Sequence, residues 1–246
     1  FFAAFVVALS ASRKGGIRRV AATSQPVLQI TRGVLLVAEI CVMVIAFVKL
    51  GLVESHAVFA SYPLLIAALS GPILGEKVGP NRWAAIGVGF IGVVIILRPG
   101  FSVFSPEALI PLLSALMFAV YGLLTRYVAR KDSAETSFFW TGVAGAVAIT
   151  LIGPFFWEPI HSNDWWLMGI LCLTGAGGHF LLIKAYEVAE ASTVQPFAYF
   201  QLVFAASIGL TIFGETMDLW IVLGVGLIIG SGLFTLWRER QKSQGA

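Results

Sequence analysis

The stretch Leu74-Gly75-Glu76-Lys77 has a counterpart in Phe213-Gly214-Glu215-Thr216, and this repetition decides the fold of the chain. Each stretch ends one apolar run and begins the next. After each stretch a tryptophan precedes a Gly-x-Gly at the same spacing: Trp83, Gly87 and Gly89 in the first copy, and Trp220, Gly224 and Gly226 in the second. The pattern indicates an internal duplication within an apolar chain.

The composition indicates a chain that is solvated by lipid. Hydrophobic residues make up 58% of its 246 residues and charged residues only 12%, against about 25% charged in soluble domains. Mean hydropathy is +0.90, and a soluble domain of this length could not cover so much apolar surface. The net charge of +3 is too small and too scattered for nucleic-acid binding. Cys41 and Cys172 lack metal-binding spacing, so we expect two buried free thiols and no metal site.

Apolar runs of spanning length predict eight complete membrane helices. They fall at about 31–50, 54–75, 82–98, 106–126, 136–157, 164–184, 191–213 and 218–237. Only helices and closed barrels satisfy the backbone in lipid, and the short alternating segments of a barrel are absent. The segment Phe1 to Ser10 is shorter than the about 20 residues of a span, so we expect it to be the tail of a helix whose beginning is missing. The predicted fold class is an all-α polytopic membrane protein with about eight complete helices and one partial helix.

The basic residues orient these helices, because lysine and arginine are concentrated in cytoplasmic loops. With the loop of Arg13 and Lys14 in the cytoplasm, the opposite face keeps only Lys49 and Arg98 of the 16 basic residues. The cytoplasmic set is Arg13, Lys14, Arg18, Arg19, Arg32, Lys77, Arg82, Arg126, Arg130, Lys131, Lys184, Arg238, Arg240 and Lys242. We therefore expect a multi-pass protein of the cell (inner) membrane with a cytoplasmic C-terminus.

This orientation places the two copies of the motif on opposite faces of the membrane. Gly75-Glu76 lies at the cytoplasmic end of its span and Gly214-Glu215 at the outer end of its own, with an odd number of spans between them. The two halves are then inverted repeats, which we place at residues 1–100 and 101–246. Inverted repeats are typical of secondary transporters, in which the substrate site lies between the repeats and access alternates between the two faces.

Several stretches resemble the drug/metabolite transporter superfamily, in its EamA-type branch. In the first half they are Tyr62-Pro63-Leu64-Leu65, Gly75-Glu76-Lys77, Arg82-Trp83-Ala84-Ala85, Gly89-Phe90-Ile91-Gly92 and Leu97-Arg98-Pro99-Gly100. In the second half they are His179-Phe180-Leu181-Leu182-Ile183-Lys184-Ala185-Tyr186, Gln195-Pro196-Phe197-Ala198-Tyr199 and Phe213-Gly214-Glu215. The resemblance implies two EamA-type helix bundles, ten helices in the intact protein and cytoplasmic termini. It also implies amino-acid, nucleoside or cofactor-like substrates, with both importers and exporters in the family.

Glu39 is the most deeply placed carboxylate in the predicted spans. A charge at the bilayer centre is costly and usually faces a cavity or a partner. The functional interpretation is a proton-coupling carboxylate or an anchor for a cationic substrate group. The alternative is a structural carboxylate that is protonated or hydrogen-bonded between helices.

His179 lies in the repeat partner of the Glu39 span, next to Gly175-Ala176-Gly177-Gly178. Such small residues permit close helix approach or a local break that lines a cavity. His179 could relay protons or bind substrate there. A hydrogen bond that packs helices is the alternative.

Pro63 and Pro196 fall in equivalent spans, and helices broken at matching positions point to a substrate site at the midplane of the bilayer. We expect polar and aromatic side chains near these breaks to contact substrate, although each aromatic ring could instead face lipid or pack internally. The candidate set is Tyr62, Tyr121, Trp140, Gln195, Tyr199 and Gln201, together with Glu39 and His179.

The leading hypothesis is a secondary active transporter that moves a small organic metabolite by alternating access, with protons as the candidate coupling ion. The chain has no GxxxxGK[ST] motif for ATP, and we expect no cofactor. A membrane-embedded enzyme with an acid/base pair of Glu39 and His179 would need a nucleophile or metal, and none stands out. A non-transporting structural subunit is the other alternative. The expected partners are the substrate and the lipid bilayer, with the protein a monomer or a homodimer.

Overall fold

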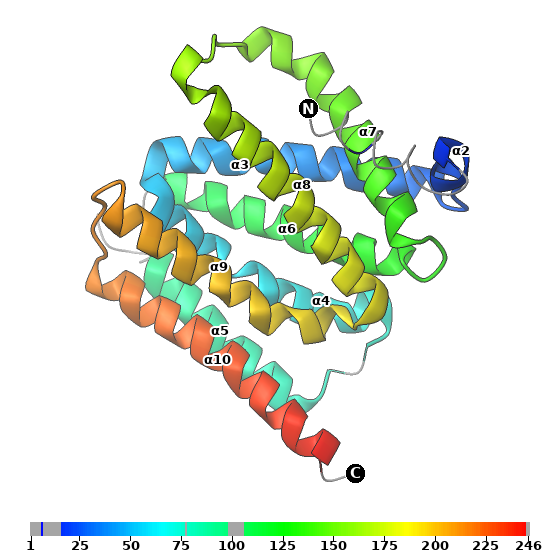
Figure 1. Ribbon diagram of the computed structural model, residues 1–246. Coiled ribbons are helices and arrows are strands. Elements are labelled where there is room, and N and C mark those ends of the chain that lie inside the picture. Colours follow the sequence, from blue (N-terminus) through cyan, green and yellow to red (C-terminus); the bar gives the residue numbers. More distant parts are fainter. Residues whose placement is uncertain (1–5, 7–15, 77, 98–105, 245–246) are drawn as a thin grey trace. The chain divides into compact units, whose positions relative to one another are not determined.

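The computed structural model of the chain describes residues 6, 16–76, 78–97 and 106–244 (Figure 1). Several sequence-based expectations lie outside these residues. They are the helix tail at 1–10 apart from Val6, the basic residues Arg13, Lys14, Lys77 and Arg98, and the joint at Arg98-Pro99-Gly100.

The described residues are helical and contain no strand. The α-helices are α2 (Gly16–Ala21), α3 (Pro26–Phe59), α4 (Tyr62–Leu74), α5 (Pro80–Leu97), α6 (Leu109–Val128), α7 (Ala134–Ile152), α8 (Trp165–Val188), α9 (Ala191–Thr211) and α10 (Leu219–Gln244). Short 3-10 turns lie at Pro106–Ala108, Gly153–Phe156 and Ser162–Asp164. Six of the helical segments are long and apolar enough to cross a membrane, and α4 and Leu219–Thr235 are shorter apolar helices. The predicted all-α, multi-pass membrane fold is confirmed.

A bend at Gly51 divides the long helix α3. Gly51 has φ 78° and ψ 178°, a backbone conformation that is almost restricted to glycine because any Cβ would clash there. A second break follows at Ala60 and Ser61, and α4 then begins with Pro63 in its first turn, where the missing N–H costs no hydrogen bond. The predicted span 54–75 is therefore two shorter helices, 52–59 and α4, rather than one.

The contacts divide the chain into two compact units, and each is described by itself. Unit 1 holds residues 1–38 and 124–189, and unit 2 holds residues 39–123 and 190–246. Each unit combines segments from both ends of the sequence. The division into repeats at 1–100 and 101–246 stays a prediction.

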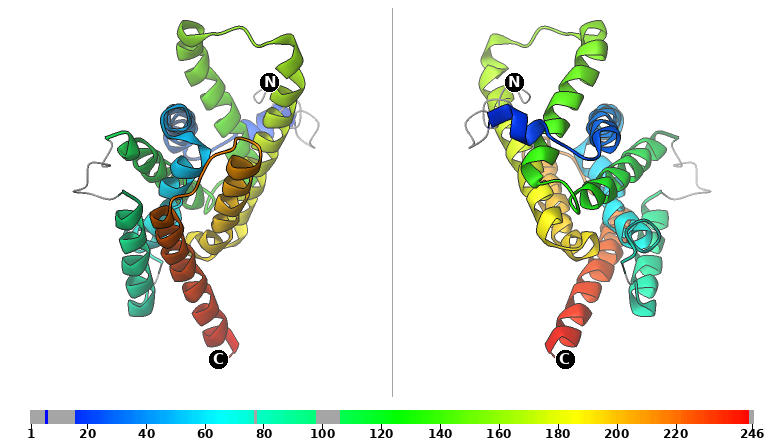
Figure 2. Two further views of the ribbon diagram at one scale, coloured as in Figure 1. Left: turned by 90° about the vertical axis from the view of Figure 1, so that its left-hand side faces the viewer. Right: turned by 90° about the vertical axis from the view of Figure 1, so that its right-hand side faces the viewer.

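Unit 2 contains two helix pairs, α5 with α10 and α4 with α9, together with residues 39–59 of α3 and 109–123 of α6. The α5–α10 pair lies side by side in Figures 1 and 2. Glycines permit this approach: a Cβ added to Gly92 would lie 2.6 Å from the carbonyl oxygen of Gly224, and the converse distance is also 2.6 Å. The buried core that joins the pairs includes Val58, Leu64, Val93, Ile96, Tyr199, Leu202 and Ile228.

Unit 1 packs α2 and α8 against α7 around an apolar core that includes Val20, Phe138, Phe139 and Ile183. Next to this core, Arg32 is fully buried. Its guanidinium donates to Gln29 Oε1 at 2.8 Å, to Thr125 Oγ1 at 3.2 Å and to the carbonyl oxygen of Ser137. Gln29 in turn donates to Asp132 Oδ2 at 2.8 Å. This network ties the start of α3 to the end of α6 and the start of α7.

Candidate substrate site

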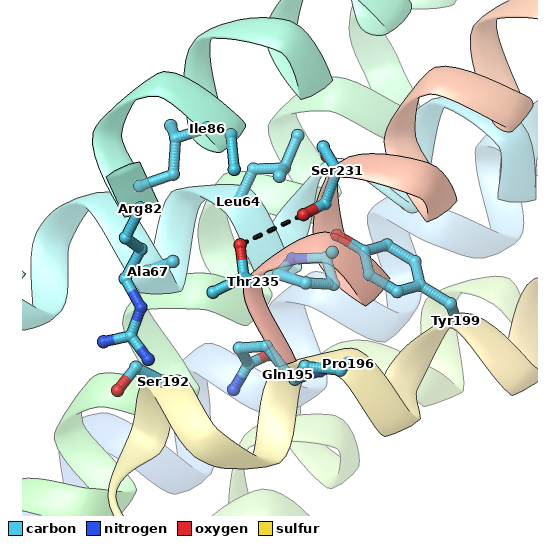
Figure 3. A pocket seen from close by; sticks show the side chains of 13 residues that line it. Leu64, Ala67, Arg82, Ile86, Ser192, Gln195, Pro196, Tyr199, Ser231 and Thr235 are labelled. Carbon is cyan, nitrogen blue, oxygen red and sulfur yellow. Dashed lines mark hydrogen bonds between the residues drawn. The ribbon is translucent and has the colours of Figure 1, made fainter. Parts of the chain in front are cut away.

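Six of the eight predicted substrate-site residues belong to unit 2, and four of them lie on α4 and α9. Two pockets lie against this helix pair. The first, which we call the Arg82 pocket, spans about 320 Å³ between α4, α5, α9 and α10 (Figure 3). Its polar lining consists of Arg82, Ser192, Gln195, Tyr199, Ser231 and Thr235. Figure 3 shows the Arg82 side chain reaching toward Ser192 at one end of the pocket.

Internal hydrogen bonds occupy part of this polar lining. The Gln195 amide nitrogen donates to the carbonyl oxygen of Ala191 at 2.6 Å, and the Thr235 hydroxyl donates to that of Ser231 at 3.0 Å. The pocket therefore combines the Arg82 guanidinium with hydrogen-bonded polar groups and apolar walls.

The second pocket, which we call the His56 pocket, spans about 200 Å³. It is lined by His56, Phe59, Tyr62, Gln201 and others, and it shares Pro63 and Tyr199 with the Arg82 pocket. The Tyr199 ring is 5% exposed and packs against Gly232 so closely that a Cβ there would collide with it. Tyr199 and Pro63 therefore form a common wall of the two pockets.

A cluster of aromatic rings extends from the His56 pocket across α3, α4 and α6. The ring of Phe59 lies 4.9 Å from Tyr62 and 5.5 Å from Phe118 between centroids, and the rings of Tyr62 and Phe118 are 4.8 Å apart. Tyr121 continues the cluster at 5.7 Å from Phe118. Rings at these separations form offset or edge-to-face pairs, and the cluster borders the His56 pocket through Phe59 and Tyr62.

Glu39 lies next to this cluster. Glu39 is 4% exposed, and its carboxylate accepts a hydrogen bond of 2.6 Å from the Ser114 hydroxyl. Ser114, Phe118 and Tyr121 are spaced four and three residues apart on α6, so they share one helix face. Unit 2 therefore places one buried carboxylate within a helical turn of an aromatic wall. This combination can bind a positively charged group together with a planar ring.

Two predicted site residues, Trp140 and His179, belong to unit 1. The Trp140 indole N–H donates to the carbonyl oxygen of Ala21 at 3.2 Å, which is a packing role. His179 lies within α8, which is continuous from Trp165 to Val188, so the expected local break is not present. A Cβ at Gly175, Gly177 or Gly178 would meet no described atom within 4 Å. Close helix approach at these glycines is therefore not found in unit 1.

The two prolines take different places in their helices. Pro63 lies in the first turn of α4, which begins after a break in the helical path at Ala60 and Ser61. Pro196 lies inside α9, which continues through it from Ala191 to Thr211. A proline this close to a helix start removes a single backbone hydrogen bond, and the helix is not interrupted.

Several residues of the pockets were not predicted from the sequence. Arg82, Ser192, Ser231 and Thr235 line the Arg82 pocket, and Phe59, Ser114 and Phe118 surround the Glu39 site. In the sequence, the spacing that puts Ser114 and Phe118 on the same helix face as Tyr121 could have identified these two residues. Among the described residues no group of three His, Cys, Asp or Glu side chains could hold a metal, and Cys41 and Cys172 are free thiols, each half-buried rather than buried.

Comparison with known proteins places this architecture in a family. A sequence profile of the EamA-like transporter family matches residues 105–237. The S-adenosylmethionine uptake transporter of Rickettsia prowazekii (strain Madrid E) is 28% identical over 219 residues, which cover 89% of this chain and 74% of that protein. The riboflavin transporter of Rhizobium johnstonii is 30% identical over 227 residues, or 90% of this chain and 74% of that protein.

A solved crystal structure shares the fold: it aligns with 98% of this chain and 85% of its own, with a TM-score of 0.71 at 19% identity. The fold, the sequence profile and the transporter relatives agree with one another. The chain belongs to the EamA-like transporter family, and the protein is a multi-pass membrane transporter and not an enzyme.

Proposed function

We propose that the protein is a secondary active transporter of a cofactor-like metabolite that carries a planar ring and a positive charge. The observation that supports this most directly is the Glu39–Ser114 pair beside the rings of Phe118 and Tyr121. Placing a carboxylate within the membrane costs free energy, so such a residue usually pairs with another group or has a function. A cationic ring-bearing substrate would neutralise the charge and stack on the aromatic wall.

The names of the relatives supply two candidate ligands with different charges. S-adenosylmethionine carries a purine ring and a sulfonium cation, whereas the riboflavin ring system is uncharged. Both ring systems would stack on the rings of Phe118 and Tyr121, but only S-adenosylmethionine carries a positive charge that the Glu39 carboxylate could bind. We therefore propose an S-adenosylmethionine-like substrate, with a neutral flavin as the competing outcome.

We further propose alternating access by inverted repeats, with Glu39 as the coupling group for protons. In unit 2, α4 pairs with α9 and α5 pairs with α10, which is the pairing expected of equivalent helices from two repeats. Because Glu39 would bind either a proton or a cationic substrate, binding of the one would displace the other. Substrate movement would then respond to a pH gradient.

Uptake into proteoliposomes tests this proposal. Radiolabelled S-adenosylmethionine should accumulate under an imposed pH gradient and should be competed by excess unlabelled compound but weakly by riboflavin. Glu39→Gln should lower the uptake at least about tenfold and abolish the response to the gradient, because a buried charge-assisted contact contributes about 1.5–3 kcal/mol.

Glu158→Gln is the matched control, because Glu158 is an exposed carboxylate between α7 and α8 and should leave uptake unchanged. Wild-type flux in Glu39→Gln would assign Glu39 a structural role. Uptake of riboflavin in preference to S-adenosylmethionine would overturn the choice of a cationic substrate.

A further inference from the structure

The two Gly-Glu pairs end their helices in the same way. After α4, Gly75 has φ 73° and the Glu76 N–H donates to the carbonyl oxygen of Ser70 at 3.3 Å. After α9, Gly214 has φ 65° and the Glu215 N–H donates to that of Gly209 at 3.0 Å. In both bonds the donor lies six positions after the acceptor, and the bond closes across a left-handed glycine of the kind that ends many helices. The backbone of each pair therefore closes its own helix.

The side chain of Glu76 has a different partner. Its Oε1 accepts from the Ala191 N–H at 3.0 Å and its Oε2 from the Ser192 N–H at 3.4 Å. Ala191 and Ser192 are the first two residues of α9, whose N–H groups have no partner within the helix. The carboxylate that follows α4 therefore caps the start of α9.

Glu215 makes the reciprocal contact. Its two oxygens accept from the Leu52 N–H at 2.8 Å and the Val53 N–H at 2.7 Å, which begin the segment that leads into α4. The bend at Gly51 frees these two N–H groups. A Cβ on Gly51 would lie 3.0 Å from Glu215 Oε1, so glycine also leaves room for the carboxylate. The carboxylate that follows α9 caps the helix before α4.

The two carboxylates lie at opposite ends of the α4–α9 pair. Glu76 joins the end of α4 to the start of α9, and Glu215 joins the end of α9 to the segment before α4. In Figure 1 the orange loop after α9 lies beside the bend in α3. Because α9 has 21 residues, its ends are separated by about 30 Å, the thickness of the hydrocarbon core. The separation of the two contacts along α9 therefore matches the thickness of the hydrocarbon core.

Each contact also adjoins one of the two pockets. Ser192, whose N–H binds Glu76, lines the Arg82 pocket. His56, which lines the other pocket, bonds the carbonyl oxygen of Leu52, whose N–H binds Glu215. Tyr199 and Pro63 lie between the pockets. Each carboxylate is therefore linked to a different pocket.

We propose that Glu76 and Glu215 are two opposed clasps of the transport cycle, each a positioning residue that holds one end of the α4–α9 pair closed. Both clasps are formed in this structure. Release of Glu76 opens the Arg82 pocket while Glu215 serves as the pivot, and release of Glu215 opens the His56 pocket while Glu76 serves as the pivot. This inference rests on the proposed alternating access.

Cysteine accessibility measures the two openings separately. Ala67 lines the Arg82 pocket and Ala198 the His56 pocket, so Ala67→Cys and Ala198→Cys serve as reporters after Cys41 and Cys172 are replaced by alanine. Membrane-impermeant maleimide is added from either side of vesicles that contain the full chain. The result is the ratio of the two labelling rates, measured for wild type, Glu76→Gln and Glu215→Gln.

Glu76→Gln should raise labelling at Ala67→Cys relative to Ala198→Cys by about fivefold, and Glu215→Gln should lower the ratio by a similar factor, because a helix cap contributes about 1 kcal/mol. Glu158→Gln should not change it. A purely structural role would shift both variants in the same direction or in neither, and that outcome overturns the proposal. If a glutamine variant does not fold, the aspartate variant keeps the charge and should shift the ratio with the same sign.

Uptake in the same vesicles separates this proposal from the proposed function. Opposed shifts in labelling without uptake of S-adenosylmethionine would support the clasps and reject the substrate. Uptake with unchanged labelling would support the substrate and reject the clasps.

Discussion

At the scale of single residues, Gly51 is the position with the strictest backbone requirement. Gly51→Ala should lower the free energy of unfolding by about 1–3 kcal/mol, because φ 78° with ψ 178° excludes a Cβ. The new methyl group would also press against the Glu215 carboxylate. Thermal unfolding of the purified protein in detergent measures the change.

Gly226→Ala is the matched control for that substitution, since a Cβ at Gly226 would meet no described atom within 4 Å. Alanine is the better helix former by about 1 kcal/mol, so this variant should be as stable as wild type or more so. Equal loss of stability in both variants would show that the Gly51 conformation carries no special cost.

Some single residues could be predicted from the sequence and others could not. Glu39 is recognisable as a carboxylate deep in an apolar run, and the structure gives it a buried partner, Ser114. The side-chain contacts of Glu76 and Glu215 are not recognisable in this way. Their partners lie more than 100 residues away along the chain, and only the pairing of α4 with α9 brings them together.

At the scale of helices, the α5–α10 contact depends on glycines that face each other. Gly92→Leu should destabilise the protein by about 1–3 kcal/mol, the usual cost of overpacking, because its Cβ would lie 2.6 Å from a backbone carbonyl of α10. Gly87→Leu, on the same helix but in open space, should have little effect. Unfolding temperatures of the two variants would reveal the difference, and equal values would mean that α5 and α10 do not pack through Gly92.

Helix positions are predictable to within a few residues where an apolar run is uninterrupted, as for α5 and α6. The segment 54–75 is the exception. Its hydrophobicity is continuous, and hydropathy alone does not show that Gly51 takes a glycine-only conformation or that α4 starts afresh near Pro63. Backbone geometry at single positions, rather than composition, sets where that helix breaks.

At the scale of the whole molecule, the positive-inside rule predicts the membrane topology. Gly79→Cys, between α4 and α5, should be labelled only from the cytoplasmic side, and Thr216→Cys, between α9 and α10, only from the outer side. Impermeant maleimide applied to intact cells and to inverted vesicles distinguishes the two. Labelling of both positions from one side would contradict the inverted topology.

The compact units differ from the predicted repeats in a way that sequence order could not reveal. Each unit draws segments from both halves of the chain. In unit 2 the strongest pairings join α4 to α9 and α5 to α10, helices that would correspond to each other in the predicted repeats. Periodicity and hydropathy describe each helix alone, so they carry no information on which helices pair.

The contact between Glu215 and Leu52 has a consequence for biosynthesis. The two residues are 163 positions apart, so at about 5–20 residues per second the ribosome needs about 10–30 s to make the second after the first. During that interval the N–H groups at the bend lack their carboxylate. The Glu215 carboxylate can therefore bind Leu52 and Val53 only in an assembly step that follows membrane insertion of the first half. A chain that stops before Glu215 would leave the N–H groups at the bend without this cap.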